Sequence, residues 1–140
     1  MSAIAVTAAN VASGTGAITE SGTAGETITA GQLVYKLSSD GEFYLAQADD
    51  ADTDAVYGIA LNGASDGQPI SVLTSGQITI GGTAVQGVIY VLDDAVAGAI
   101  VPWGDLTADD TDYLTIIGPG ISATVIDVDI TVTGVVLPTP

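Results

Sequence analysis

Short runs of β-branched and aromatic residues, each ended by a turn, constrain this chain more than any other feature. Within residues 27–73, the runs that we predict to be strands are 33–37, 43–45, 57–61 and 70–73. Asp40-Gly41 and Asp66-Gly67 supply turns between them, because glycine adopts positive φ without a steric penalty. No window of a dozen residues has helical spacing without an interrupting glycine or β-branched cluster. The pattern predicts an all-β protein.

The same series of runs is then repeated. Val34-Tyr35-Lys36-Leu37 returns as Ile89-Tyr90-Val91-Leu92, and Ile70-Ser71-Val72 returns as Ile126-Asp127-Val128. Gly76 and Gly134 are predicted to close the two units, which span about 27–76 and 83–134. Stable repeat arrays need at least three units, so two units are expected to close on each other as one small barrel or sandwich.

The 140 residues suit a single domain, which we place at 23–140. Residues 1–22 differ from it, because small residues and glycines leave too little bulk for a core. We predict an extended N-terminal arm that pairs with a partner, since strand addition draws affinity from main-chain hydrogen bonds. A frayed terminus is the alternative. Ile4, Val6 and Val11 are the residues expected to bind through this arm.

Two features of the second half predict where its residues lie in a sheet: Pro102 predicts a sheet edge, and residues 121–137 predict a half-exposed strand. Pro102 excludes a central strand position, because proline lacks the N–H that a ladder needs. Trp103 is therefore expected at an edge or in a loop, where it either caps the fold or, with Pro102, contacts another subunit. Residues 121–137 alternate apolar with polar side chains, which predicts a half-exposed strand.

The formal net charge is −16, from seventeen acidic residues against Lys36 as the single base. Nucleic-acid binding is excluded on this ground, since cations must replace the phosphate counterions. The same charge disfavours anionic membranes, and it favours solubility. Neither a signal peptide nor an apolar run of membrane-spanning length is recognised.

Catalytic and metal-binding patterns are weak. Asp50, Asp52 and Asp54 begin like a calcium loop, but the sixth and twelfth positions hold Ala55 and Leu61 instead of Gly and Glu. We interpret these aspartates as turn formers, with a loose calcium site as the open alternative. Histidine and cysteine are absent, which removes the commonest general base and thiol chemistry. The sequence predicts no enzyme and no cofactor.

A glycosidase-like carboxylate pair is the remaining catalytic alternative. Glu20, Glu26 and Glu42 could pair with aspartates for such chemistry. Clefts of that kind are usually lined with aromatic residues, and this chain has one Trp, one Phe and five Tyr. A small hydrolase therefore stays a minor alternative.

Several strand-and-turn motifs resemble a known family. They are Thr29-Ala30-Gly31-Gln32-Leu33-Val34-Tyr35, Tyr57-Gly58-Ile59-Ala60-Leu61-Asn62, Gly67-Gln68-Pro69-Ile70-Ser71-Val72, and Gly87-Val88-Ile89-Tyr90 followed by Pro102. Over residues 23–134 the chain resembles the capsid cement, or head decoration, proteins of tailed bacteriophages. It departs from the family pattern in its acidity and in its Ala-, Thr- and Gly-rich arm.

The resemblance implies a small β-barrel or β-tulip-like domain that forms a homotrimer on the outer surface of the virion. Such a protein binds at threefold positions of the head and bridges neighbouring major capsid protein subunits against the pressure of packaged DNA. We therefore expect a structural virion protein that stabilises the capsid. The alternative is a tail, fibre or spike domain that binds a host surface.

Overall fold

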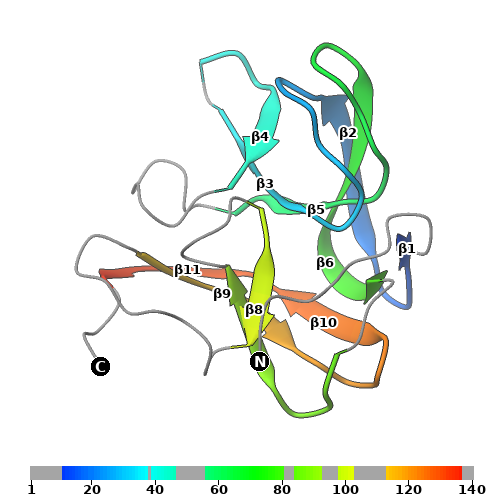
Figure 1. The fold of residues 1–140 in the computed structure, drawn as a ribbon, viewed down its shortest axis with the longest axis vertical. Helices are drawn as coiled ribbons and strands as arrows, with labels where there is room; N and C mark the ends of the chain where they lie inside the picture. The colour runs from blue at the N-terminus through cyan, green and yellow to red at the C-terminus, as the bar shows by residue number, and fades with distance from the viewer. Residues whose placement is uncertain are drawn as a thin grey trace.

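The computed structural model describes residues 11–37, 39–46, 56–80, 84–92, 98–102 and 113–136. These residues form strands and turns without any helix, so the all-β prediction is confirmed (Figure 1). The strands are β1 (Val11–Ser13), β2 (Ile18–Thr23), β3 (Leu33–Lys36), β4 (Phe43–Leu45), β5 (Gly58–Ala60), β6 (Pro69–Ile80), β7 (Ile89–Leu92), β8 (Ile100–Pro102), β9 (Tyr113–Pro119), β10 (Val125–Asp129) and β11 (Thr131–Val136).

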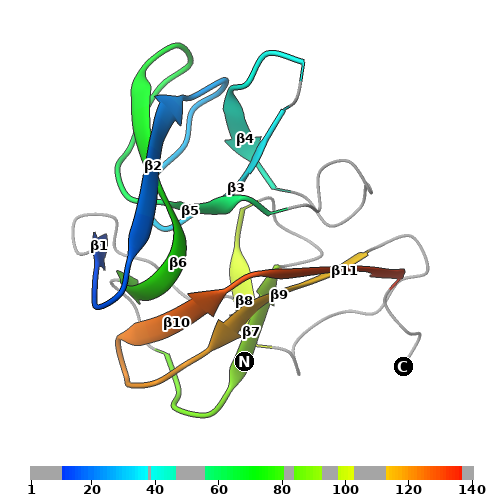
Figure 2. The ribbon, with the colours of Figure 1, turned by 180° about the vertical axis from the view of Figure 1, so that it is seen from behind.

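The strands form two antiparallel sheets. The first sheet has seven strands in the order β1-β6-β5-β3-β4, with β2 and β10 also paired to β6. The second has four strands in the order β11-β9-β7-β8. Figure 2 shows the two sheets from behind: β2 to β5 of the first sheet lie above, the second sheet lies below, and β10 of the first sheet lies among the lower strands. A single bridge between Ala24 and Phe43 links β4 to the end of β2, but neither sheet closes into a barrel.

The two predicted repeat units pair their strands in the same order. The first sheet contains the series β4-β3-β5-β6, and the second sheet contains β8-β7-β9-β11. One part of the predicted alignment is wrong. Residues 126–128, matched in the sequence to 70–72, lie in β10, which pairs with β6 of the first sheet. The place that corresponds to β6 belongs to β11, which pairs with β9.

β6 is the strand that both halves of the chain share. Val72 pairs with β2 on one side and β5 on the other, whereas Ile78 pairs with β1 and β10. The prediction that Gly76 closes the first unit is wrong, because β6 continues through it. Gly76 has a φ of 97°, a conformation that glycine tolerates and other residues rarely adopt. Gly134 likewise lies inside β11 rather than ending the second unit.

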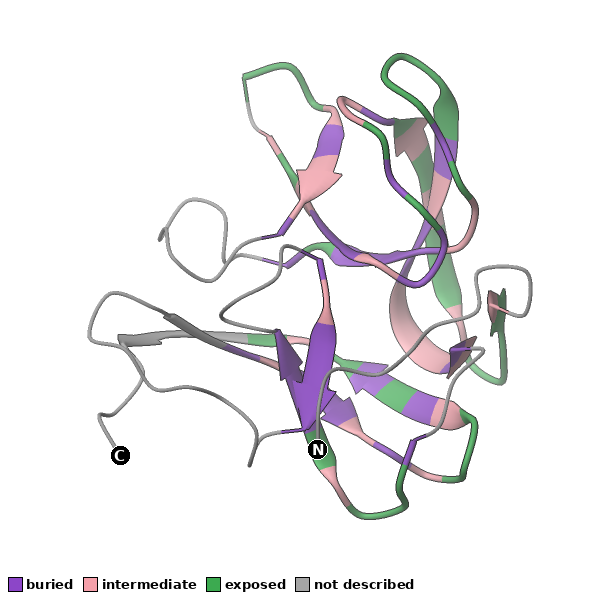
Figure 3. Ribbon diagram, viewed as in Figure 1, coloured by how far each residue is buried: buried purple, intermediate pink, exposed green. Residues whose placement is uncertain are grey.

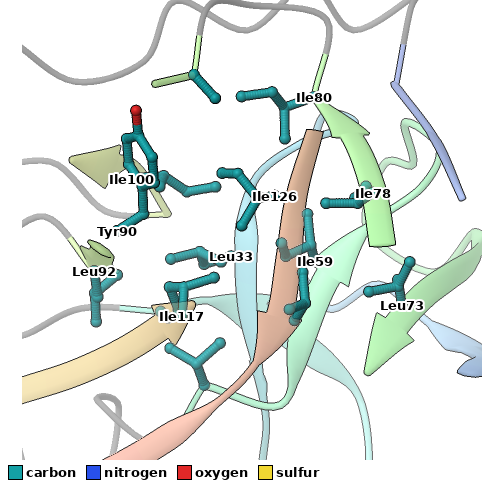
Figure 4. Packing of buried hydrophobic residues seen from close by; sticks show 14 residues of the cluster. Leu33, Ile59, Leu73, Ile78, Ile80, Tyr90, Leu92, Ile100, Ile117 and Ile126 are labelled. Carbon is teal, nitrogen blue, oxygen red and sulfur yellow. The ribbon is translucent and has the colours of Figure 1, made fainter. Parts of the chain in front are cut away.

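Two apolar cores hold the sheets together. Adjacent side chains of a strand point to opposite faces, so Ile59 enters one core and Ala60 the other. Figure 4 shows the larger, inter-sheet core, where isoleucine and leucine side chains from both sheets cluster together and Tyr90 lies at one side of the cluster beside Ile100. The inter-sheet core contains Leu33, Ala46, Val56, Ile59, Leu73, Ile78, Ile80, Ala84, Tyr90, Leu92, Ile100, Ile117, Ile126 and Val128. The small core contains Ala24, Ile28, Val34, Phe43, Ala60, Ala64, Ile70 and Val72.

The last strands keep the alternation that the sequence predicts. Ile126 and Val128 are buried in the inter-sheet core, and Asp127 and Asp129 are exposed. Pro102 ends β8, an edge strand of the second sheet. This agrees with the position predicted from its missing N–H.

Candidate interaction surface

The N-terminal strands run antiparallel along the whole length of β6. Ser13 pairs with Ile78 in β1, and Thr23 pairs with Pro69 in β2. Between the two strands the Gly14 N–H donates to the Gln77 carbonyl over 2.7 Å. Residues 11–23 therefore belong to the first sheet. Without them, the main-chain N–H and C=O groups on one side of β6 would be unpaired.

This pairing corrects the prediction of a free, partner-binding arm for residues 11–22, and residues 1–10 of the predicted arm lie outside the described residues. Val11, which the sequence predicts to bind a partner, pairs with Ile80 of its own chain and is half-buried. Ile4 and Val6 lie outside the described residues. The sequence could not reveal the intramolecular pairing, because the unoccupied side of β6 is a product of long-range topology.

The outer side of this N-terminal strand pair is uncovered within the described part of the chain. β1 and β2 pair only with β6, and most of their side chains are exposed, with Ile18 at 62%. Figure 3 shows exposed and intermediate colours along β2, whereas β7 and β8 are mainly buried. Residues 1–19 contain no charged side chain. Charges at edges usually block strand pairing, so residues 11–19 form an open, uncharged edge.

The edges at β4, β8 and β11 are better protected. At β4, the Gly25 N–H donates to the Phe43 carbonyl over 2.8 Å, and the Leu45 N–H donates to Glu26 Oε2 over 3.0 Å. β8 is three residues long, buried, and ends in Pro102. β11 is uncharged, but its register with β9 shifts between Val132 and Val136, and such irregularities disfavour strand addition.

A cluster around Lys36, the only base in the chain, fastens β2 to the rest of the first sheet. Lys36 Nζ lies 3.9 Å from Glu20 Oε2 on β2, 5.8 Å from the Phe43 ring centroid and 5.5 Å from the Tyr57 ring centroid. An ammonium within about 6 Å of an aromatic ring is attracted by the ring face. Gly22 lets β2 approach the Phe43 ring, because a Cβ at that position would overlap it.

The Glu20 carboxylate also affects Tyr57. A hydrogen bond to Glu20 raises the pKa of the Tyr57 hydroxyl, with burial and the negative charge of Glu20 adding to the effect. Glu20 Oε2 is buried and has no hydrogen-bond partner among the described residues. Lys36 is therefore the group that compensates this oxygen. Sequence reasoning missed the cluster, since Glu20 and Lys36 share no local pattern.

Replacing Lys36 by methionine is expected to loosen β2, because the aliphatic packing is kept while the ion pair is lost. Both side chains are about 40% exposed, so we expect a coupling of only about 0.5–1 kcal/mol in a double-mutant cycle with Glu20→Gln. Hydrogen exchange of the β2 amides should accelerate in Lys36→Met and return toward the wild-type rate in the double variant. Equal exchange rates in all four proteins would contradict a fastening role for the cluster.

The far end of the β3–β4 hairpin is strongly acidic. The Tyr44 hydroxyl donates to Asp40 Oδ2 over 2.7 Å, and the Glu42 N–H donates to Asp40 Oδ1 over 2.9 Å. Hydrogen bonds from Glu42 and then Tyr44 lower the pKa of Asp40. The bond to Asp40 raises the pKa of Tyr44 to about 12, helped by burial and by the charges of Asp40, Glu42 and Asp66.

A pH dependence follows from the Asp40–Tyr44 bond. The unfolded tyrosine loses its proton near its ordinary pKa of 10.0, whereas folded Tyr44 keeps it to about 12. The stabilisation from Tyr44 is therefore complete below pH 10 and is lost as the pH rises through about 12. In an ultraviolet titration, Asp40→Asn should bring the pKa of one tyrosine back toward 10. Tyr44→Phe should remove the late titration of this tyrosine altogether. A wild-type titration in which no tyrosine has a raised pKa would contradict this.

The other predicted site residues are not gathered into one place. Val11 lies in the first sheet and Pro102 in the second, and Pro102 is buried within the chain. Trp103, Asp50, Asp52 and Asp54 lie outside the described residues. No cluster of three or more acidic residues in the described segments is arranged to hold a metal ion.

No protein-family model matches the chain, and no curated protein matches it. Within the described segments there is no helix of the length and hydrophobicity that a membrane span requires.

Proposed function

We propose that this chain is a capsid cement protein, which binds the outer surface of a tailed-phage head and bridges neighbouring major capsid protein subunits. The sequence motifs in residues 23–134 support the proposal. The uncharged edge of residues 11–19, which is uncovered within the described part of the chain, is the observation that carries it. A strand of the capsid protein adds to this edge through main-chain hydrogen bonds.

The edge suits this role because the residues that would bind the capsid protein carry no charge, whereas the rest of the chain is acidic. The chain carries a net charge of −16, yet its first charged residue is Glu20. A partner strand that pairs with residues 11–19 therefore meets no carboxylate in that part of the edge. The acidic remainder keeps the protein soluble and suits a surface exposed to solvent.

The proposed assembly on the shell is a homotrimer, as the resemblance implies. Three copies offer three N-terminal edges, and linked binding sites raise the overall affinity because later contacts form within one complex. No nucleic acid, membrane, cofactor or metal takes part in this function.

Two substitutions test the edge directly. Ile18→Asp places a charge on it. Ser13→Pro removes an N–H that points outward, because the Gly14 N–H points to β6 and the direction alternates along an antiparallel ladder. Each variant should lower binding to purified heads that lack this protein by at least about tenfold, in line with about 1.4 kcal/mol or more. Co-sedimentation measures the binding, and circular dichroism confirms folding.

Thr23→Asp is the matched control for these variants. It adds the same charge to an exposed residue of β2, but at the end where the neighbouring segment already pairs with β4. This control should bind like the wild type. Binding of Ile18→Asp and Ser13→Pro at the wild-type level would refute the proposed edge contact.

Counting copies in purified virions tests the cement role itself. Quantitative mass spectrometry should give a copy number close to that of the major capsid protein. A handful of copies would instead favour the tail, fibre or spike alternative, and complete absence would overturn a virion role.

A further inference from the structure

The side chain of Asn62 holds the loop between β5 and β6 closed. Its Oδ1 accepts a hydrogen bond from the Ser71 N–H in β6 over 2.7 Å. Its Nδ2 donates to the Pro69 carbonyl, also in β6, over 3.3 Å and to the Gly63 carbonyl over 3.0 Å. The start of the loop is thereby joined to the first residues of β6, and we call these three hydrogen bonds the Asn62 clamp.

The Asn62 clamp requires an amide. Its oxygen faces one N–H donor, and its NH2 group faces two carbonyl acceptors. An ionised carboxylate accepts hydrogen bonds and donates none. An aspartate at position 62 would therefore lose the bonds to Gly63 and Pro69 and would place a negative oxygen beside their carbonyl oxygens. Only the bond from the Ser71 N–H would be left.

Gly63 makes Asn62 the more reactive of the two asparagines in the chain, Asn10 and Asn62. The main-chain nitrogen after an asparagine can attack the side-chain Cγ and form a five-membered succinimide ring, and a bulky side chain beside that nitrogen hinders the attack. Asn10 is followed by the β-branched Val11, whereas Gly63 has no side chain. Gly63 is exposed, and its N–H has no hydrogen-bond partner within the described segments, so this nitrogen is available for the reaction.

We propose that Asn62 is a site of spontaneous deamidation, and that this reaction irreversibly opens the Asn62 clamp. The Gly63 nitrogen bonds to Asn62 Cγ, the Cγ–Nδ2 bond breaks, and the NH2 group leaves as ammonia with the proton of the Gly63 N–H. Water then opens the succinimide at either carbonyl, which gives aspartate or isoaspartate. Both products carry a carboxylate in place of the NH2 donor, so neither can remake the bonds to the Gly63 and Pro69 carbonyls.

The Asn62 clamp also controls when the reaction occurs. The NH2 group that leaves donates to two carbonyls, so these hydrogen bonds must break before the ring can form. The reaction therefore proceeds from molecules in which the loop has opened locally, and only a fraction of the folded molecules are open at any time. Two main-chain bonds between Ile28 and Ala64, at 2.8 and 2.9 Å, anchor the loop independently of Asn62, so release of the clamp leaves the sheet folded.

Ageing of the purified protein at mildly alkaline pH tests the proposal. Peptide mass mapping should find the amide-to-acid change at Asn62, with Asn10 unchanged as the internal reference. Because the loop must open first, the rate in the folded protein should be at least about tenfold below the rate in guanidinium chloride. Gly63→Ala should slow the reaction at least about tenfold through steric hindrance. The fold tolerates this variant, since Gly63 has no positive φ and the nearest atom to an added Cβ is the Ile28 carbonyl oxygen at 3.7 Å.

Hydrogen exchange of the aged protein tests the opening of the clamp. The Leu61 N–H, which donates to the Ser71 carbonyl over 2.8 Å, and the Ser71 N–H should both exchange faster after conversion. Asn62→Asp should reproduce this change, and aged Gly63→Ala should not show it. Conversion of Asn62 no faster than that of Asn10, equal rates in folded and denatured protein, or unchanged exchange after complete conversion would each overturn the proposal. None of these measurements depends on binding to a capsid.

Discussion

Gly118→Ala is expected to destabilise the protein by about 2–5 kcal/mol, a large part of the stability of a typical domain. Gly118 lies in β9 with a φ of 146°. A side chain in such a conformation costs about 1–2 kcal/mol. The added Cβ would also overlap the Asp127 carbonyl oxygen, where β9 passes β10. Overpacking against a fixed backbone adds about 1–3 kcal/mol.

Chemical denaturation measures this loss, and Gly87→Ala provides its control. Gly87 also has a positive φ, 84°, but a Cβ there would have no neighbour within 4 Å. The control should therefore lose only the conformational part, about 1–2 kcal/mol. Equal losses in the two variants would show that the close approach of β9 to β10 contributes nothing.

Phe43→Ala is expected to lower the free energy of unfolding by about 3–5 kcal/mol, since it removes a large, fully buried side chain. Phe43 is 0% exposed and is the only aromatic residue in the small core. Its ring also lies 5.5 Å from the ring of Tyr57 and beneath the Lys36 ammonium. The substitution therefore weakens the small core and the attachment of β2 together.

Tyr44→Ala, one residue further along β4, is the matched control. Tyr44 points to the opposite face, where it is half-buried and stacks on Tyr35 with ring centroids 5.8 Å apart. Its loss should cost much less, because it removes only an aromatic pair and a hydrogen bond that water already reaches. A Phe43→Ala loss no larger than that of Tyr44→Ala would contradict the importance of the small core.

The sequence predicts local structure well in this chain and long-range pairing poorly. β3, β4 and β5 lie where β-branched and aromatic runs between turns predict them, because these signals act within a few residues. The alternation over 125–129 is also predicted correctly. The prediction for Gly76 is wrong, because a glycine that ends a strand and one that bends a continuous strand look the same in sequence.

For the candidate surfaces too, the sequence predicts features that depend on one residue and misses features that depend on long-range pairing. The edge position of Pro102 follows from the chemistry of one residue and could be predicted. The cluster of Glu20, Lys36, Phe43 and Tyr57 could not, since it requires β2, β3, β4 and the residue before β5 to be in place. Residues 11–13 and 18–23 of the N-terminal segment are strands, but the partner of β1 lies more than fifty residues away in the chain, which the sequence does not reveal.

The position of β6 has a consequence for how the chain folds during synthesis. Its partners stand at both ends of the chain: β1 and β2 leave the ribosome long before it, and β10 leaves long after it. β1 and β2 cannot pair until β6 has been synthesised. One side of β6 is then without its β10 partner until β10 has been synthesised. Such non-local pairing slows folding. The uncharged N-terminal segment therefore stays unpaired on the nascent chain, and nearby chains on the same messenger RNA are exposed to it at that stage.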